Sequence, residues 1–304
     1  MAETVLFHET VLLEEAIDWL GLQSGQVIVD GTLGLGGHAR RILEKILPKG
    51  RLLGFDRDAQ ALAEAGRRLA VFEANMSFIH DDYKNVDRHL EELGIAQVDG
   101  MLLDLGVSSM QLESPARGFS FRAEGPLDMR MDVRGSLTAE EIVNRTPEKE
   151  LEKILRVYGE ERLARRVARK IIETRKARRI RTTSELESII FHAVPVSYRR
   201  GRIHPATRSF QALRIAVNGE LESLKNFLLK SVHHLKNGGR LVIISFHSLE
   251  DREVKNKFRE FQKENLGAVL TRKPVRASMA EMARNPRSRS AKLRVFERRM
   301  ERTP

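Results

Sequence analysis

The sequence predicts an α/β protein with a mostly parallel sheet, into which a helical domain is inserted. Short apolar runs alternate with helical patterns through the N-terminal third of the chain, as in sheets that carry helices on both faces. The middle of the chain then shows helical patterns without strands, and strand-type runs return near the C-terminus. We therefore expect the sheet-forming part at 1–109 and 208–304, and the helical insertion at 110–207.

The elements before the insertion follow from local patterns. Apolar residues recur on one face of three segments, which predicts helices over 11–20, 39–47 and 59–72. Short apolar runs predict buried strands at 27–29, 51–55, 78–79 and 101–103. Residues 108–135 show no period, but their phenylalanines, leucines and methionines indicate an ordered, packed loop.

The later elements depend on start and stop signals. Thr182 with Glu185 predicts a capping box at the start of a helix in the insertion. One long helix is expected from about residue 209 to residue 235, ended by the two glycines at 238 and 239. The remaining segments predict a strand, a helix and a closing antiparallel pair, in this order: 240–246, 250–263, and 269–271 with 293–297.

The composition excludes several classes of protein. Hydrophobic residues make up 41% and charged residues 31%, which is typical of a globular chain. The absence of cysteine excludes disulfides, thiolate metal sites and any cysteine nucleophile. No basic stretch leads into an apolar run at the N-terminus, and no apolar run approaches the ~20 residues of a membrane span. We expect a cytoplasmic protein without a membrane partner.

The positive charge is concentrated in two segments. The net charge is +11, and residues 151–215 hold 17 lysines and arginines against 6 glutamates. Residues 270–304 hold 11 against 3, so the rest of the chain carries a net charge of −8. Such a distribution is typical of a phosphate-facing surface on an acidic body. The alternative is a set of arginine-rich helix faces that are simply solvated.

A glycine-rich loop follows the first predicted strand and opens a helix. It spans 30–38 with the sequence DGTLGLGGH, and ligands bind beyond strand ends at this position in doubly wound sheets. Asp56 ends the second strand, where an acid binds ribose hydroxyls. The dinucleotide pattern G-x-G-x-x-G is not matched, and Asp30 would repel a pyrophosphate. A cofactor with ammonium and sulfonium charges, S-adenosylmethionine (SAM), fits better than NAD; the alternative is a glycine turn with Asp30 as a local cap.

Longer motifs resemble the MraW-type family of bacterial 16S rRNA cytosine-N4 methyltransferases. They run in order along almost the whole chain: HETVLLEE (8–15), GTLGLGGH (31–38), DGMLLDLGVSS (99–109), RGFSF (117–121), GPLDMRMD (125–132), YGEER (158–162), HPATR (204–208), FQALRI (210–215), SFHSLEDR (245–252) and NPR (285–287). The resemblance implies a class I SAM-dependent methyltransferase core interrupted by a helical substrate-recognition domain. It also implies methylation of a decoding-centre cytosine amine, with 16S rRNA or the small ribosomal subunit as partner.

The resemblance also implies a set of SAM contacts in this chain. Carried over motif by motif, they are Gly36, Gly37, His38, Asp56, Tyr83, Asp104 and Gln111. Two positions depart from the family pattern. Met110 stands where proline is usual before Gln111, and Tyr83 stands where phenylalanine is common. The first change affects a turn, whereas tyrosine keeps an aromatic ring that can stack on adenine.

The reaction sets chemical requirements for the site. A cytosine amine is a poor nucleophile, so the site must align it with the methyl group and offer an acceptor to its N–H hydrogens. Asp104 and the turn that reaches Ser109 follow the fourth strand, in the position where such an acceptor is expected. The Asp/Asn-Pro-Pro-aromatic turn of many amine methyltransferases is missing. Asp104 is thus either a site residue or a strand-end cap.

Other side chains have competing interpretations. His247 contacts the base, relays a proton, or is a hydrogen-bonded structural residue. Ser248 and Asp251 match a capping box. Phe119, Phe121 and Phe210 either stack a flipped cytosine or pack in the core, which is the commoner fate. The arginines of 162–181, 199–202 and 284–294 are expected to contact phosphates. The histidine spacing predicts no metal site.

Two rival functions agree with these observations. The chain is either a methyltransferase for another RNA, a protein or a small molecule, or a non-catalytic RNA-binding assembly factor with an unused SAM pocket. Methyl transfer from labelled SAM to rRNA, small subunits or protein separates these possibilities.

Overall fold

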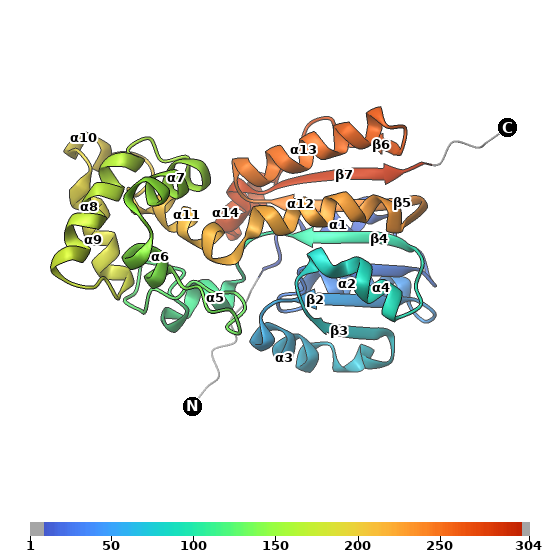
Figure 1. Ribbon diagram of the computed structural model, residues 1–304. Coiled ribbons are helices and arrows are strands. Elements are labelled where there is room, and N and C mark those ends of the chain that lie inside the picture. Colours follow the sequence, from blue (N-terminus) through green and yellow to red (C-terminus); the bar gives the residue numbers. More distant parts are fainter. Residues whose placement is uncertain (1–8, 300–304) are drawn as a thin grey trace. The chain divides into compact units, whose positions relative to one another are not determined.

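The computed structural model describes residues 9–299, so His8 of the first family motif lies outside the described residues. The chain divides into two compact units (Figure 1). The sheet unit comprises Met1–Gly106 and Leu221–Pro304, and the helical unit comprises Val107–Glu220. The helical unit therefore interrupts the sheet unit in the sequence.

The sheet unit contains a seven-stranded sheet with the order β3-β2-β1-β4-β5-β7-β6. Its strands are β1 (Val27–Asp30), β2 (Arg51–Asp56), β3 (Met76–His80), β4 (Val98–Asp104), β5 (Leu235–Ser245), β6 (Gly267–Val269) and β7 (Lys292–Arg298). Strands β1 to β5 are parallel, whereas β7 pairs antiparallel with both β5 and β6. The predicted α/β class is thus confirmed, and so is the closing antiparallel pair, in which Val269 faces Phe296.

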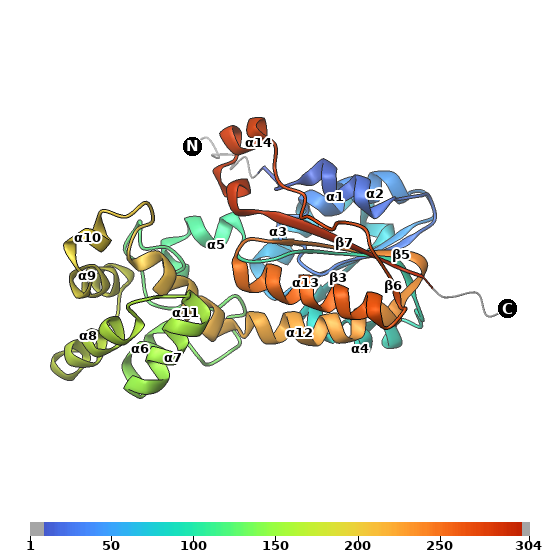
Figure 2. The same ribbon diagram turned by 90° about the horizontal axis from the view of Figure 1, so that it is seen from above.

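Helices cover both faces of this sheet. They are α1 (Leu13–Leu20), α2 (Gly37–Ile46), α3 (Ala59–Arg68), α4 (Val86–Glu92), α12 (Glu220–Ser231), α13 (Ser248–Lys263) and α14 (Met279–Arg284). Successive strand residues point to opposite faces. Ile28 therefore packs in one buried cluster, with residues of α1 and α2, while Val29 packs in another with residues of α4, α12 and α13. Figure 2 shows α1 and α2 on one side of the sheet and α12 and α13 on the other.

The helical unit has a buried core of its own. Its helices are α5 (Ser109–Glu113), α6 (Ala139–Arg145), α7 (Glu148–Gly159), α8 (Ala164–Ala177), α9 (Thr183–Ala193), α10 (Val196–Arg199) and α11 (Ala206–Asn218). The loop between α5 and α6 is ordered and packed, as predicted, because Leu127 and Met129 are buried in this core. The Met131 N–H also donates to Asn218 Oδ1 of α11 at 2.7 Å. The predicted capping box of α9 is present, with the Glu185 N–H donating to Thr182 Oγ1 at 3.2 Å.

The predicted long helix over 209–235 is wrong, because the chain forms two helices separated at Gly219. This glycine has a φ of 60°, a left-handed conformation that ends α11. The break separates two cores. Phe210 and Leu213 of α11 are buried in the helical unit, whereas Leu224 and Phe227 of α12 are buried in the sheet unit. The helical unit therefore ends at Glu220, whereas the sequence predicted its end at residue 207. It begins at Val107, whereas the expected first residue was 110.

The glycines at 238 and 239 do not end a helix, which corrects a second expectation. They lie inside β5, which begins at Leu235. Leu235 is fully buried and faces Val98 of β4, and the register then shifts between Val98 and Gly100. Burial of this leucine and pairing with β4 thus draw the segment into the sheet.

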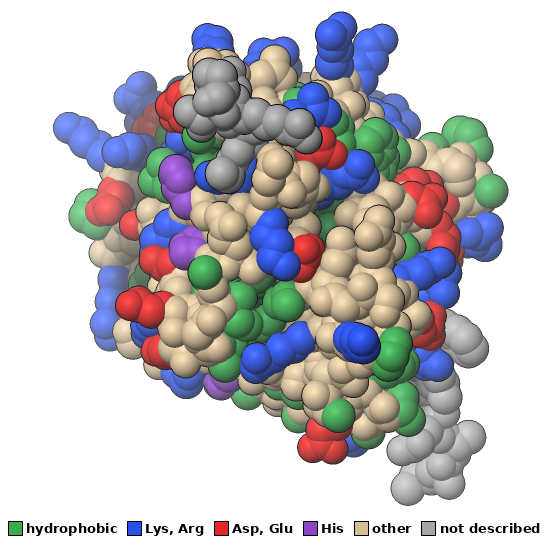
Figure 3. Space-filling model, turned by 90° about the vertical axis from the view of Figure 1, so that its right-hand side faces the viewer, with side chains coloured by type: hydrophobic (Ala, Val, Ile, Leu, Met, Phe, Trp, Pro, Cys, Tyr) green, Lys and Arg blue, Asp and Glu red, His purple; other side chains and the backbone are tan. Residues whose placement is uncertain are grey.

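One end of the sheet unit carries charged side chains of both signs (Figure 3). Figure 3 looks at the end of the sheet where the parallel strands begin, and acidic and basic side chains are interspersed there. At this end, Lys236 Nζ, near the start of β5, lies 2.9 Å from Asp99 Oδ2, near the start of β4. Within residues 9–299, no helix has the length and apolar character needed to cross a membrane.

Two glycines with open surroundings test the helix break. Apart from the adjoining backbone, no atom lies within 4 Å of a Cβ built on Gly219 or on Gly66, but only Gly219 has a positive φ. Gly219→Ala should lower the free energy of unfolding by about 1 kcal/mol because alanine is strained in the left-handed region. Gly66→Ala, inside α3, should raise it by about 0.5–1 kcal/mol. Urea unfolding measures both, and changes of the same sign would contradict the assigned conformations.

Candidate functional site

Three aspartates end neighbouring parallel strands at one edge of the sheet. Asp30 is the last residue of β1, Asp56 of β2 and Asp104 of β4. Strand β1 lies between the other two, with Asp30 facing Gly54 on one side and Leu102 on the other. The parallel pairing therefore brings the three carboxyl groups to the edge where ligands bind in sheets of this kind.

The loop that follows β1 is fastened to both neighbouring strands. The Gly31 N–H donates to the carbonyl of Leu102 at 2.9 Å, and the Leu33 N–H donates to that of Phe55 at 2.8 Å. The Asp104 N–H donates to Thr32 Oγ1 at 2.6 Å. These bonds hold the loop between the ends of β2 and β4, so its backbone is positioned before any ligand arrives.

The predicted residues Gly36, Gly37 and His38 form the start of α2. Gly36 caps the helix with a φ of 81°, which favours glycine, and Gly37 is the first helical residue. The His38 side chain is buried, and its Nδ1 atom lies 3.9 Å from Asp104 Oδ2. The structure thus brings His38 to Asp104, two predicted residues that are far apart in the sequence.

The three strand-end carboxyls are electrostatically unusual. Burial raises the pKa of Asp30 to about 7, assisted by the charge of Asp56 and opposed by the Thr32 N–H bond. Burial likewise raises the pKa of Asp56 to about 6. Burial, followed by the charges of Asp30 and Glu250, raises the pKa of Asp104 well above its ordinary value. Over residues 9–299, no lysine or arginine forms an ion pair with these groups.

Two of these carboxyls keep oxygens without a partner. Asp30 Oδ1 accepts from the Thr32 N–H at 3.1 Å, but Asp30 Oδ2 is buried and has no hydrogen-bond partner in the described part of the chain. The same holds for Asp104 Oδ1. Buried polar atoms are normally satisfied, so these two oxygens indicate a position for a cationic or hydrogen-donating ligand. Asp30 was not among the predicted site residues, although its position at the loop had suggested a cation.

Asp56 has a different role from the other two acids. Its Oδ2 accepts from the Gly34 N–H at 2.8 Å, and its Oδ1 accepts from the Asp58 N–H at 2.8 Å. Each carboxylate oxygen has two lone pairs, so both can still accept a hydroxyl proton. The carboxyl group of Asp56 therefore both anchors the glycine loop and remains able to bind a diol.

Tyr83 lies in a short 3₁₀ turn (Tyr83–Asn85) after β3. The residue is only 7% exposed, and its ring meets the ring of Phe227 edge to face, with the centroids 5.5 Å apart. Most of the ring is therefore committed to the core of the sheet unit, and a bound adenine would reach it over a small area.

His247 and Glu250 form the capping box of α13. The Glu250 N–H donates to His247 Nδ1 at 3.3 Å, and Glu250 Oε2 accepts from the Phe246 N–H at 2.9 Å. The proposed capping box of Ser248 with Asp251 is therefore wrong. Asp251 instead accepts from Lys292 and Arg294 of β7. This cap supports the structural interpretation of His247. The charge of Glu250 also contributes to the raised pKa of Asp104. Glu250 was not among the predicted site residues, although its position three residues after His247 fits a capping box.

Ser109 and Gln111 belong to the helical unit. They lie in α5 and are both buried. Ser108 caps this helix, and the Gln111 side chain accepts from the Ser108 N–H at 3.0 Å. Gln111 therefore forms a capping box with Ser108. The three-residue spacing of these two residues in the sequence could have predicted it.

The phenylalanines that could have stacked on a base, and one of the predicted phosphate-binding arginines, have partners within the protein. Phe119 and Phe210 are buried in the core of the helical unit, which confirms the packing interpretation for both, and Phe121 packs against them while stacking on His204 at 4.8 Å. The prediction that Arg294 contacts a phosphate is wrong. It is 6% exposed and its Nε atom lies 2.6 Å from Asp251 Oδ1.

The chain is similar to known proteins over almost its full length. Residues 5–299 match the sequence model of the MraW methylase family. A protein of Syntrophotalea carbinolica named ribosomal RNA small subunit methyltransferase H is 50% identical, over 98% of this chain and 100% of that protein. Proteins of the same name are 48% identical in Geotalea uraniireducens, over 96% and 98% of the two chains, and 46% identical in Halothermothrix orenii, over 97% and 99%.

Replacing Asp30 with Asn tests the cost of burying its carboxyl. The folded protein retains a proton on Asp30 up to about pH 7, whereas an unfolded aspartate loses it near its ordinary pKa of 3.8. The free energy of unfolding therefore falls as the pH rises between these values, and the loss is complete above the higher one. Asp30→Asn should be more stable than the wild type by on the order of 3 kcal/mol at about pH 8, with no gain near pH 4.

Urea unfolding of the ligand-free protein at these two pH values measures the difference. Asp18→Asn, at an exposed position of α1, is the control for removing one carboxylate. A gain that is the same at both pH values, or absent at both, would contradict the raised pKa.

Proposed function

Because the chain belongs to the MraW methylase family, we propose that it methylates the exocyclic N4 amine of a cytosine in the decoding centre of 16S rRNA. The cofactor is S-adenosylmethionine. The family match along nearly the whole chain carries the proposal, and the relatives are named for methylation of small-subunit ribosomal RNA. The reaction would take place in the cytoplasm, on 16S rRNA or the small subunit.

The residues at the edge of the sheet fit this cofactor. When bound, SAM supplies a methyl group on a positively charged sulfur, and it also carries an ammonium group. Asp30 and Asp104 offer buried carboxyl oxygens that lack partners in the described chain. A cation beside them would favour their charged forms and offset the burial that raises their pKa. Asp56 keeps the lone pairs that a ribose diol requires.

The same acids suit an amine substrate. A cytosine amine shares its lone pair with the ring, so its nitrogen must become pyramidal as it attacks. An oxygen that accepts a hydrogen bond from the amine N–H favours that change and can take up the released proton. We assign this role to Asp104, with His38 as its neighbour at 3.9 Å. Ser109 and His247 remain further predicted site residues.

The experiment that tests the proposal is a nucleoside analysis. The protein is incubated with labelled SAM and, separately, small subunits, naked 16S rRNA or total cell protein, and digested RNA is analysed by mass spectrometry. We expect N4-methylcytidine in the small-subunit RNA. Label in protein or in another nucleoside would favour a different methyltransferase, and SAM binding without any transfer would favour an assembly factor.

Asp104→Asn tests the role of this carboxyl in turnover. The change keeps the shape of the side chain but removes a charged acceptor, so kcat should fall about 10²- to 10³-fold. Unfolding should be unaffected or shifted to higher urea, because a buried carboxyl with a raised pKa is removed. Asp99→Asn, the same chemical change at the opposite end of β4, is the control and should retain activity. Wild-type turnover by Asp104→Asn would remove Asp104 from the site.

A further inference from the structure

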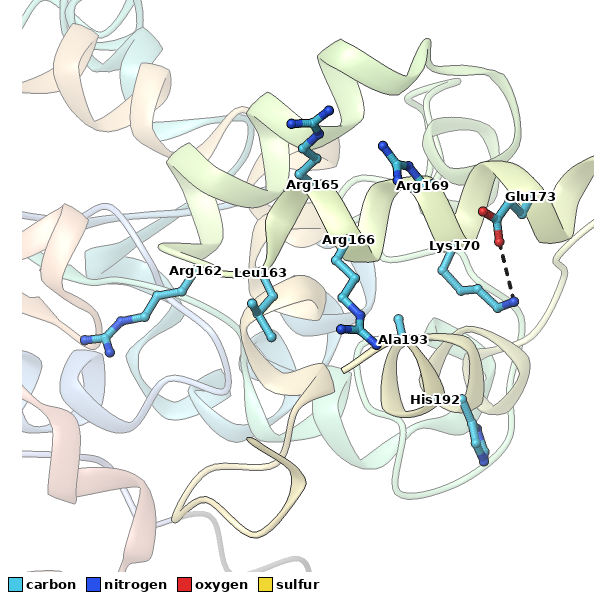
Figure 4. A pocket seen from close by; sticks show the side chains of 9 residues that line it. All are labelled: Arg162, Leu163, Arg165, Arg166, Arg169, Lys170, Glu173, His192 and Ala193. Carbon is cyan, nitrogen blue, oxygen red and sulfur yellow. Dashed lines mark ion pairs between the residues drawn. The ribbon is translucent and has the colours of Figure 1, made fainter. Parts of the chain in front are cut away.

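Helix α8 presents a run of cations to one open groove of the helical unit. The groove has a volume of about 780 Å³ and lies beside the end of α9 (Figure 4). Its lining includes Arg162, Arg165, Arg166, Arg169 and Lys170. Within α8, Arg165 and Arg169 are four positions apart, and so are Arg166 and Lys170, so each pair lies side by side on the helix surface, while Arg162 precedes the helix.

Four of these cations have no counter-ion. In the described part of the chain, no carboxylate lies within ion-pair distance of Arg162, Arg165, Arg166 or Arg169. All four are exposed, and only Lys170 has an acidic neighbour, with Glu173 Oε2 at 3.5 Å from its Nζ. Figure 4 shows Arg166 and Lys170 extending toward α9, and Arg165 and Arg169 leaving α8 on its other side.

The helical unit contains further arginines outside this groove. Seven of them form ion pairs with carboxylates of this unit: Arg130 with Asp128, Arg134 with Asp132, Arg145 with Glu141, Arg156 with Glu152, Arg178 with Glu185, Arg179 with Glu140, and Arg214 with Glu220. Acids of this unit thus neutralise seven arginines outside the groove, whereas no carboxylate of the described chain pairs with the four arginines that line it.

This arrangement works against the stability of α8. Like charges three and four residues apart repel one another on a helix. Arg165 and Arg166 also occupy the first turn, which contains no acidic residue, and cations are unfavourable there because the helix N-terminus is itself positive. Solvation alone does not require such a cluster. An anion with several regularly spaced charges would relieve the repulsion.

We propose that this groove, lined by Arg162, Arg165, Arg166, Arg169 and Lys170, binds consecutive phosphates of an RNA strand. The inference rests on the proposed function only in taking RNA as the substrate. Guanidinium groups bind phosphate oxygens with paired hydrogen bonds, and a row of them follows a polyanion. The groove thus holds the RNA backbone irrespective of base sequence, while the base to be methylated is selected by other contacts.

The test compares two triple variants with the same change in charge. The groove variant is Arg165→Gln, Arg166→Gln and Arg169→Gln. The matched control is Arg134→Gln, Arg145→Gln and Arg156→Gln, which removes three exposed, ion-paired arginines of the same unit. Binding of a labelled fragment of small-subunit rRNA is measured by fluorescence anisotropy over a range of KCl concentrations, and binding of SAM is measured by calorimetry.

We expect the groove variant to bind the RNA at least about tenfold more weakly at roughly 0.1 M KCl. The slope of log Kd against log salt should decrease by about 2–3, as expected for three lost phosphate contacts. The control should keep the wild-type slope, and both variants should keep the wild-type affinity for SAM.

The outcomes separate this inference from the proposed function. Equal loss of RNA binding in both variants, equal retention in both, or absence of RNA binding by the wild type would overturn the groove assignment. A selective loss in the groove variant, with no methyl transfer to RNA by the wild type, would uphold the groove and refute the proposed reaction.

Discussion

The candidate site depends on the parallel pairing of β1 with β2 and β4. This pairing brings Asp30, Asp56 and Asp104 to one edge, although they are spread over the N-terminal third of the sequence. It also presents the carbonyls of Leu102 and Phe55 to the loop after β1, which fixes the loop backbone. An antiparallel arrangement would send neighbouring strand ends to opposite edges and disperse the acids.

The cost of this arrangement is electrostatic. Three carboxyl groups end neighbouring strands without an ion-paired lysine or arginine in the described chain, and desolvation raises the pKa of each. Buried charges are normally paired, and perturbed pKa values of this kind gather at functional sites. Under the proposed function, the sulfonium and ammonium groups of SAM would supply the missing counter-charge and offset the cost of burying these carboxyl groups.

Basic side chains of this protein differ in whether an acidic partner lies beside them. In the sheet unit, Arg294 is paired with Asp251 and Arg240 with Glu297. The helical unit pairs many of its arginines but leaves those at the groove of α8 without acidic partners. Net charge therefore says little about which arginines are available to a nucleic acid, because availability depends on the local acids.

The sequence by itself determined the features that short-range patterns encode. Strand and helix periodicity, the glycine loop after Asp30, the capping box of Thr182 and the basic character of the insertion all depend on neighbouring residues. Only the tertiary structure decided the break at Gly219 between two cores, the entry of Leu235 into β5 and the neutralisation of Arg294. These features depend on which core buries a side chain and which charge lies beside it. Both are set by contacts between distant segments, such as that of Arg294 with Asp251, 43 positions apart.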